Sequence, residues 1–135
     1  MTFARTVFVG AGIWGILVLT PFYWLMDLTG RHYQAPTEYP HFFYGFFSVA
    51  MAWQVAFLVI GTNPMRFRPL MGPAMLEKFG HVTTVAVLYM RSRIPAEDAI
   101  PAVTDLVLGV LFILAFLTTR RSQAPDSSAA TSATG

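Results

Sequence analysis

The sequence of 135 residues contains no cysteine, which excludes disulfide bonds, thiolate metal ligands and cysteine nucleophiles. Charged residues are also scarce: they make up 12% of the chain, whereas an ordinary soluble domain carries about 25%. The formal net charge is +2, and the few basic residues form no cluster of the kind that binds nucleic acid. We therefore expect no nucleic-acid partner. We also expect that part of the surface is covered by something other than water.

The sequence is instead rich in apolar residues, which make up 55% of it and give a mean hydropathy of +0.54. Four apolar stretches run over about 6–26, 41–62, 70–89 and 101–118. Each is close to the roughly 20 residues that cross a hydrocarbon layer of about 30 Å. This pattern predicts an all-α fold, an integral membrane four-helix bundle over residues 1–121. The Ser-, Ala-, Thr- and Gly-rich residues 122–135 are predicted to form a disordered cytoplasmic tail.

The ends of the first and fourth stretches carry local signals. No small-residue cleavage site follows the first stretch, which we interpret as a retained anchor and not a signal peptide. Pro21 is predicted to kink this first helix. Pro95, followed by Glu97 and Asp98, is typical of a helix start, because acidic side chains in the first turn favour the helix dipole. The fourth helix is therefore expected to begin before Pro101.

The orientation prediction depends on the arginines in the connections, since cytoplasmic loops carry an excess of basic residues. With both termini inside, five arginines lie on the cytoplasmic side and three outside. The inner set is Arg5, Arg66, Arg68, Arg120 and Arg121, and the outer set is Arg31, Arg91 and Arg93. We predict an N-in, C-in topology. Eight of the nine basic residues are arginine, a composition that suggests a GC-rich bacterial genome and hence a bacterial cytoplasmic membrane.

Ionisable residues interrupt the third and fourth stretches, although each costs at least about 2.5 kcal/mol inside a membrane on insertion scales. Glu77, His81 and Thr84 are spaced i, i+4 and i+7 and so share one helix face. Neighbouring helices are expected to cover that face, which predicts that the third helix is the most buried. Lys78 is predicted to extend its stem toward the cytoplasmic surface. Asp105, in the fourth stretch, is expected to approach the same interior.

These polar residues allow a functional and a structural interpretation. In the functional one, Glu77, His81 and Asp105 are candidate catalytic residues, because a carboxylate beside an imidazole can move protons near neutral pH. In the structural one, Glu77 pairs with Lys78 or with an arginine of the inner connection, His81 bonds a carbonyl across helices, and Asp105 caps a broken helix. One histidine with two carboxylates is a poor zinc set, so no metal and no cofactor is expected. Gln54 and Thr84 are candidate ligand-binding residues that would line one cavity with this group, and the deep Trp14 and Trp53 are candidates for the wall of an apolar ligand pocket.

Three glycines of the first stretch, Gly10, Gly12 and Gly15, form a surface of small residues. Small residues let two helix backbones approach closely in a membrane. We interpret this surface as a packing face, with a ligand cleft as the alternative.

Two segments carry resemblances to known families. Met26-Asp27 and the stretch Pro73–Thr84, in which His81 precedes a pair of threonines, resemble the emopamil-binding/sigma-2-receptor superfamily. That resemblance implies an intramembrane pocket for a sterol-like or amine ligand, lined by Asp27, Glu77 and His81, and in some members a proton-transfer isomerase. The segment Asn63–Leu70, running into Leu76-Glu77-Lys78, is similar to small bacterial four-helix membrane proteins that are DoxX-like in layout. This second kinship, which we favour, implies no assigned chemistry.

Three functions follow as hypotheses, in descending order. The first is a multi-pass membrane protein of structural or accessory type, acting as a homo-oligomer or within a larger membrane complex. The second is a pocket protein for an apolar small molecule, which would be an isomerase only if the acid and imidazole groups move protons. The third is a proton-coupled transporter that works as an oligomer. An enzyme is the less expected outcome, and the lipid bilayer is the partner common to all three.

Overall fold

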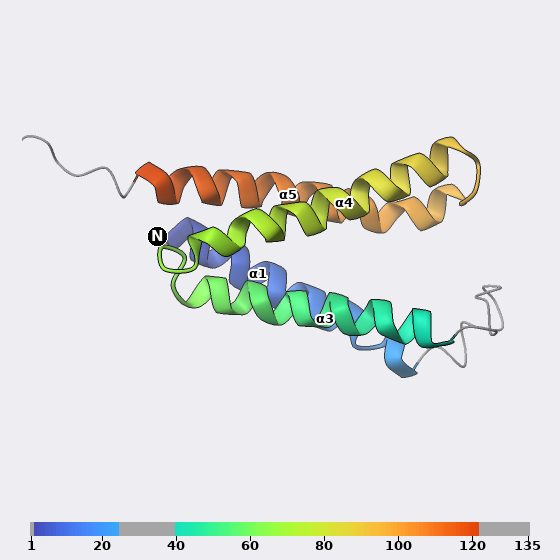
Figure 1. The fold of residues 1–135 in the computed structure, drawn as a ribbon, viewed down its shortest axis with the longest axis horizontal. Coiled ribbons are helices and arrows are strands. Elements are labelled where there is room, and N and C mark those ends of the chain that lie inside the picture. Colours follow the sequence, from blue (N-terminus) through green and yellow to red (C-terminus); the bar gives the residue numbers. More distant parts are fainter. Residues whose placement is uncertain (1, 25–39, 122–135) are drawn as a thin grey trace, which may run out of the picture.

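The computed structural model describes residues 2–24 and 40–121, and every element in these ranges is helical. The elements are α1 (Thr2–Leu19), α3 (Pro40–Thr62), the short 3₁₀ helix η1 (Arg68–Leu70), α4 (Met71–Met90) and α5 (Ala96–Arg121). Figure 1 shows the long helices α1, α3, α4 and α5. The predictions of an all-α fold and of four helices are confirmed, while the predicted tail at 122–135 lies outside the described residues.

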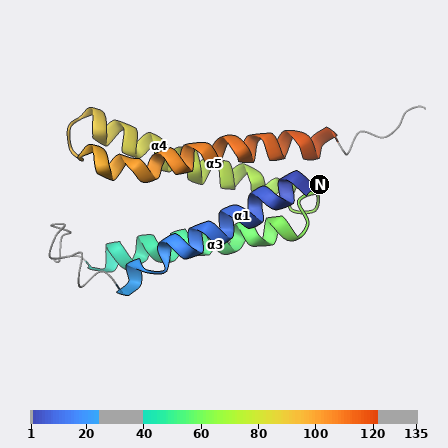
Figure 2. The same cartoon turned by 180° about the vertical axis from the view of Figure 1, so that it is seen from behind.

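The four helices form two pairs. α1 packs along α3, α4 packs along α5, and contact between α1 and α5 joins the two pairs, whereas α4 only touches α3. Figures 1 and 2 show the pairs lying close together near the N-terminus and diverging toward the turn that links α4 to α5. The pairs therefore make one packed half and one half in which they separate.

Successive helices run in alternating directions. The start of α1 lies at the same end of the bundle as the end of α3, the start of α4 and the end of α5 (Figure 1). We call this the N-terminal end. The opposite end, which holds the α4–α5 turn, is the turn end. The start of α1 and the end of α5 therefore lie at the same end of the molecule.

Prolines set two helix boundaries. α1 stops at Leu19, just before Pro21, and the helical path resumes at residues 22–24, so the kink predicted at this proline is confirmed. A proline has no N–H to donate and its ring obstructs the preceding turn. α5 begins at Ala96 and carries Pro101 inside it. The helix start predicted from Pro95, Glu97 and Asp98 is therefore confirmed. The apolar stretch 101–118 is shorter than the helix that contains it.

The core lies in the N-terminal half and is centred on three fully buried phenylalanines, which we call the phenylalanine triad: Phe8 of α1, Phe57 of α3 and Phe112 of α5. The Phe8 and Phe112 rings stack with centroids 4.3 Å apart, and Phe57 meets Phe112 edge-on at 5.0 Å. Such offset and edge-on pairs add to the free energy of burial. The triad joins both helix pairs, and the residues buried around it are Ala4, Ala11, Ile60, Met71, Ala74 and Ala115.

Glycines let α1 approach α3 closely. A Cβ on Gly12 would stand 2.8 Å from the backbone oxygen of Gln54, and a Cβ on Gly15 would overlap the Gln54 amide. A Cβ on Gly10 would meet nothing within 4 Å. The predicted packing face is therefore confirmed at Gly12 and Gly15 and wrong at Gly10, because that residue lies on the side of α1 turned away from α3.

Within the described residues, three helical segments are long and apolar enough to cross a membrane: Thr2–Trp24, Pro40–Thr62 and Ala96–Thr119. α4 is not among them, so the prediction of four spanning stretches is supported for three. The prediction that this third long helix is the most buried is wrong. It buries only Met71, Ala74 and Lys78, fewer residues than α3, because it packs chiefly against α5 at the edge of the bundle.

Candidate functional site

Four ionisable side chains meet where α4 faces α5, and we call them the ion cluster: Glu77, Lys78, His81 and Asp105. The Lys78 ammonium donates to Asp105 Oδ1 at 2.9 Å and lies 3.2 Å from Glu77 Oε2. The His81 Nδ1 is 2.6 Å from Asp105 Oδ2. Asp105 therefore uses both carboxylate oxygens, one for the ammonium and one for the imidazole.

Helix geometry explains why these residues converge. Lys78 and His81 are three residues apart on α4, so they project from neighbouring turns of one side. α5 runs antiparallel to α4 (Figure 1), which brings the middle of α5, where Asp105 lies, beside the middle of α4. Two hydrogen bonds to one carboxylate then fix the rotation of each helix against the other.

Lys78 is the most deeply buried member of the cluster, with a side chain only 5% exposed. Its Nζ lies 5.3 Å from the centroid of the Phe57 ring, so the ammonium rests on the phenylalanine triad. The prediction that Lys78 extends toward the cytoplasmic surface is wrong. Its stem turns inward because two carboxylates inside the bundle offset the free-energy cost of removing the ammonium from water. An isolated buried ammonium would have nothing to offset that cost.

Glu77 has fewer hydrogen-bond partners than Asp105. Its Oε2 is buried and accepts no hydrogen bond from the described residues, although the Lys78 ammonium is 3.2 Å away. The contact is thus an ion pair whose angles do not suit a hydrogen bond. With two carboxylates and one ammonium, the cluster has a net charge of −1 when the imidazole is neutral and of zero when the imidazole is protonated.

The structure brings together the three candidate catalytic residues, Glu77, His81 and Asp105, as the functional interpretation required. The Glu77–Lys78 pair that the structural interpretation allowed is present, but sequence reasoning missed the bond of Lys78 to Asp105. A signal was available: Lys78 is the only lysine of the chain, and it stands between two predicted intramembrane acids that need a cation. Thr84, on the same face as His81, is exposed, and its hydroxyl donates to the Gly80 carbonyl at 2.9 Å.

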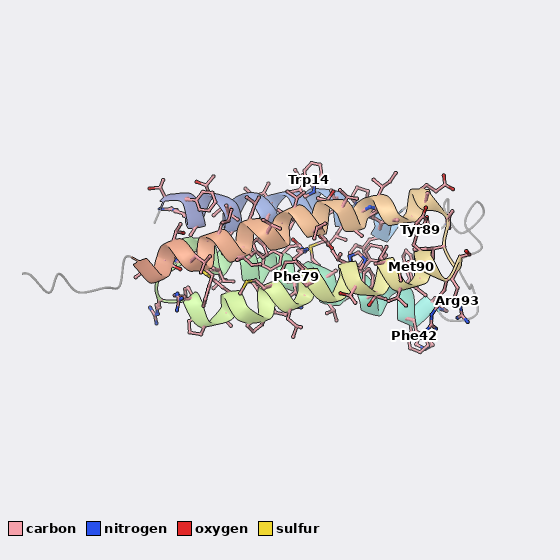
Figure 3. All side chains as sticks on the ribbon, turned by 90° about the horizontal axis from the view of Figure 1, so that it is seen from above. Trp14, Phe42, Phe79, Tyr89, Met90 and Arg93 are labelled. Carbon is pink, nitrogen blue, oxygen red and sulfur yellow. The ribbon has the colours of Figure 1, made fainter. Side chains whose placement is uncertain are left out.

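The other candidate ligand-binding residues are dispersed. Gln54 is buried against Gly15 in the α1–α3 contact, and its side-chain amide donates to the Ala50 carbonyl at 3.1 Å. The half-buried Trp53 packs on Phe57. Trp14 is 55% exposed and points away from the other helices in Figure 3. Asp27 lies outside the described residues.

The sequence predicts that these residues line a single cavity. The described ones lie apart instead. Two cavities on the described surface lie elsewhere. A pocket of about 160 Å³ between α4 and α5 is lined by apolar residues and Tyr89, and a wider hollow surrounds the α4–α5 turn, where Figure 3 labels Tyr89, Met90 and Arg93. Neither is lined by a member of the ion cluster. The charged groups face each other, and the described residues contain no set of three or more His, Asp and Glu side chains placed to hold a metal ion.

Comparison of the chain with models of protein families, with curated proteins and with solved structures finds no match.

Proposed function

We propose that this protein is a multi-pass integral membrane protein of structural or accessory type, with four crossings and both termini on the cytoplasmic side. The observation that carries the proposal is the set of three helical segments long and apolar enough to span a membrane. Large apolar side chains on their outer surfaces support it, since they would need lipid or protein to cover them. Examples are Leu17, Phe42, Val49, Ile100 and Val103.

Connectivity supports a fourth crossing by α4. If α3 and α5 both cross, the chain must return from the end of α3 to the start of α5, which lies at the opposite end of the bundle (Figure 1). α4 is the element that makes this return, and its 20 residues give about 30 Å at 1.5 Å per residue. Its charged residues are tolerable at this depth because they are paired with α5 and with one another.

The arginines support the proposed orientation. Among the described residues, Arg5, Arg66 and Arg68 stand at the N-terminal end, and Arg91 and Arg93 stand at the turn end. Arg121, which closes α5, belongs to the N-terminal end as well. An excess of basic residues marks the cytoplasmic side, so the N-terminal end would face the cytoplasm.

The mutual pairing within the ion cluster favours the accessory function over a ligand pocket. A sterol-binding or isomerase pocket would need Glu77, His81 and Asp105 to open on a cavity beside Trp14 or Trp53. The acids instead bond to Lys78 and His81, and Trp14 faces outward. The partner of an accessory protein would be another membrane protein or a second copy of this chain.

The topology is tested with single cysteines, because the natural chain has none. Thr62→Cys and Ala96→Cys place one thiol at each end, on exposed residues. A membrane-impermeant maleimide applied to intact cells is expected to label the Ala96→Cys protein only, and to label both after the cells are permeabilised. Labelling of both from outside, or release of the protein from membranes by alkaline carbonate, would contradict four crossings.

The accessory role is tested by purification of the wild-type protein in a mild detergent after cross-linking in cells. A cross-linked band that contains a second protein or a second copy is expected. Recovery of a stable, uncross-linked monomer alone would count against this role while leaving the topology intact.

A further inference from the structure

The ion cluster stands on the boundary between the packed half and the diverging half of the bundle. On its N-terminal side lie the phenylalanine triad, Met71 and Ala74, all 0% exposed. On its other side, toward the turn, the helix pairs diverge (Figure 1), and Phe46 of α3 is 57% exposed. Because the side chains next to the cluster are fully buried on the packed side and exposed on the turn side, the turn side is the more accessible one.

His81 is the member of the cluster that faces this open side. Its side chain is 33% exposed, against 5% for Lys78. The ring nitrogen Nδ1 is engaged with Asp105, and no described residue hydrogen-bonds to Nε2. Across from the ring stands Phe46, with ring centroids 6.5 Å apart. One nitrogen is therefore tied to the buried carboxylate, and the other is available to exchange a proton with water.

The charges around His81 leave room for one more positive charge. From α5 it faces Asp105, and on α4 itself the charged neighbours are Glu77 and Lys78. From α3 it meets the uncharged Phe46, and no titratable group of α1 is among its described partners. Because two carboxylates face one ammonium, the cluster is neutral only when it holds one further proton. Apolar surroundings favour the neutral assembly over a charged one.

We propose that the ion cluster is a proton-binding site that takes up and releases one proton at His81, opposite Asp105, through the turn end of the bundle only. The phenylalanine triad closes the route to the N-terminal end. The proton moves between Nε2 of the imidazole and water: on uptake an N–H forms as an O–H of hydronium breaks, and on release the reverse occurs. The site itself is independent of the proposed topology, and only the assignment of the turn end to the outer side depends on it.

The proton site is tested by NMR of ¹⁵N-histidine-labelled protein in lipid nanodiscs over about pH 5 to about pH 9, the range in which imidazoles change charge. The chain has three histidines, so His81→Gln assigns the signal and His41→Gln is the matched control. We expect the signal that His81→Gln removes and His41→Gln keeps to switch between neutral and protonated shifts. A His81 signal that stays unchanged over the whole range would overturn the proposal.

The one-sided route is tested with thiols on either side of the cluster. Thr84→Cys lies one turn beyond His81 toward the turn end, and Ala74→Cys lies one turn before Lys78 on the packed side. A charged, impermeant methanethiosulfonate is expected to modify position 84 from the side that labels Ala96→Cys, and position 74 from neither side. Modification of position 74 from the side that labels Thr62→Cys would overturn one-sided access.

In a chain with both substitutions, reaction at position 84 shows that the reagent reaches the protein, so lack of reaction at position 74 is interpretable. Should Thr62→Cys and Ala96→Cys be labelled from the same side, the proposed topology fails. The proton site would then still stand or fall on the NMR titration.

Discussion

At the scale of single residues, Lys78 shows how partners decide where a charge lies. The side chain is long enough to reach a membrane surface, and in isolation that would be its lowest-energy position. Asp105 at 2.9 Å and Glu77 at 3.2 Å offer the ammonium an internal alternative. Each carboxylate would also be costly to bury without the ammonium. The positions of the three charges therefore depend on one another.

Replacement of Lys78 by methionine is therefore expected to destabilise the protein by about 3–5 kcal/mol, the usual cost of removing one partner of a buried ion pair. The substitution keeps the length and apolar stem of the side chain but leaves two carboxylates facing each other. Unfolding by sodium dodecyl sulfate in bicelles, followed by far-UV circular dichroism, measures the change. Arg91→Met, an exposed charge at the turn end, is the control and should leave stability unchanged. A Lys78→Met protein as stable as the wild type would show that the ammonium does not neutralise this site.

At the scale of elements, the approach of α1 to α3 depends on two glycines and not on a general richness in small residues. Gly12 and Gly15 face Gln54, while Gly10 faces open space. The three look alike in the sequence, and rotation of α1 about its axis separates them. Close backbone approach of this kind contributes van der Waals contact, which substitutes for hydrophobic driving force between helices in lipid.

Gly12→Ala is expected to destabilise the protein by about 1–3 kcal/mol, the typical cost of adding a methyl group to a filled contact. The new Cβ would meet the backbone oxygen of Gln54 at 2.8 Å, and backbone cannot move aside as a side-chain end can. Gly10→Ala, two residues away, is the matched control and should cause no loss. The same detergent unfolding assay compares them. Equal effects of the two substitutions would mean that α1 packs with a different face.

At the scale of the whole molecule, the two helix pairs are joined at one end and diverge at the other (Figure 1). The phenylalanine triad and its buried neighbours lie in the joined half. The ion cluster follows directly, and beyond it few side chains are buried. The bundle is thus unequal along its length, which is the basis for access from one end.

Amide hydrogen exchange in nanodiscs is expected to show this asymmetry within α4. Residues 71–78 and 83–90 lie at matched depths from the two ends of the helix, so lipid shields them about equally. The first segment, which packs against the core, should exchange more slowly than the second, because local opening is easier where few buried contacts hold the backbone. Equal or reversed protection, measured by mass spectrometry after proteolysis, would contradict a closed N-terminal half and an open turn half.

The sequence by itself determined the helix count, the helix class and most boundaries, because these depend on local properties. Apolar runs of membrane-spanning length, the lack of an N–H at Pro21 and the acidic first turn after Pro95 act through neighbours along the chain. The i, i+4 spacing likewise placed Glu77 and His81 on one face, and Asp105 was rightly expected beside them. The bounds of α5 were set too short because the polar and charged residues at both ends of the helix were not counted with its apolar part.

Only the tertiary structure decided the inward course of Lys78, the division of the three glycines, and the position of α4 at the edge of the bundle. It also separated Gln54 and Trp14 from the acids with which the sequence had grouped them. These outcomes depend on how each helix is rotated and which neighbour it meets, and periodicity within one helix carries no such information. A buried charge needs a partner at about 3 Å, and that partner here comes partly from a residue 27 positions further along the chain. The physical reason for the difference is that the cost of burying a charge is local, whereas the group that offsets it is not.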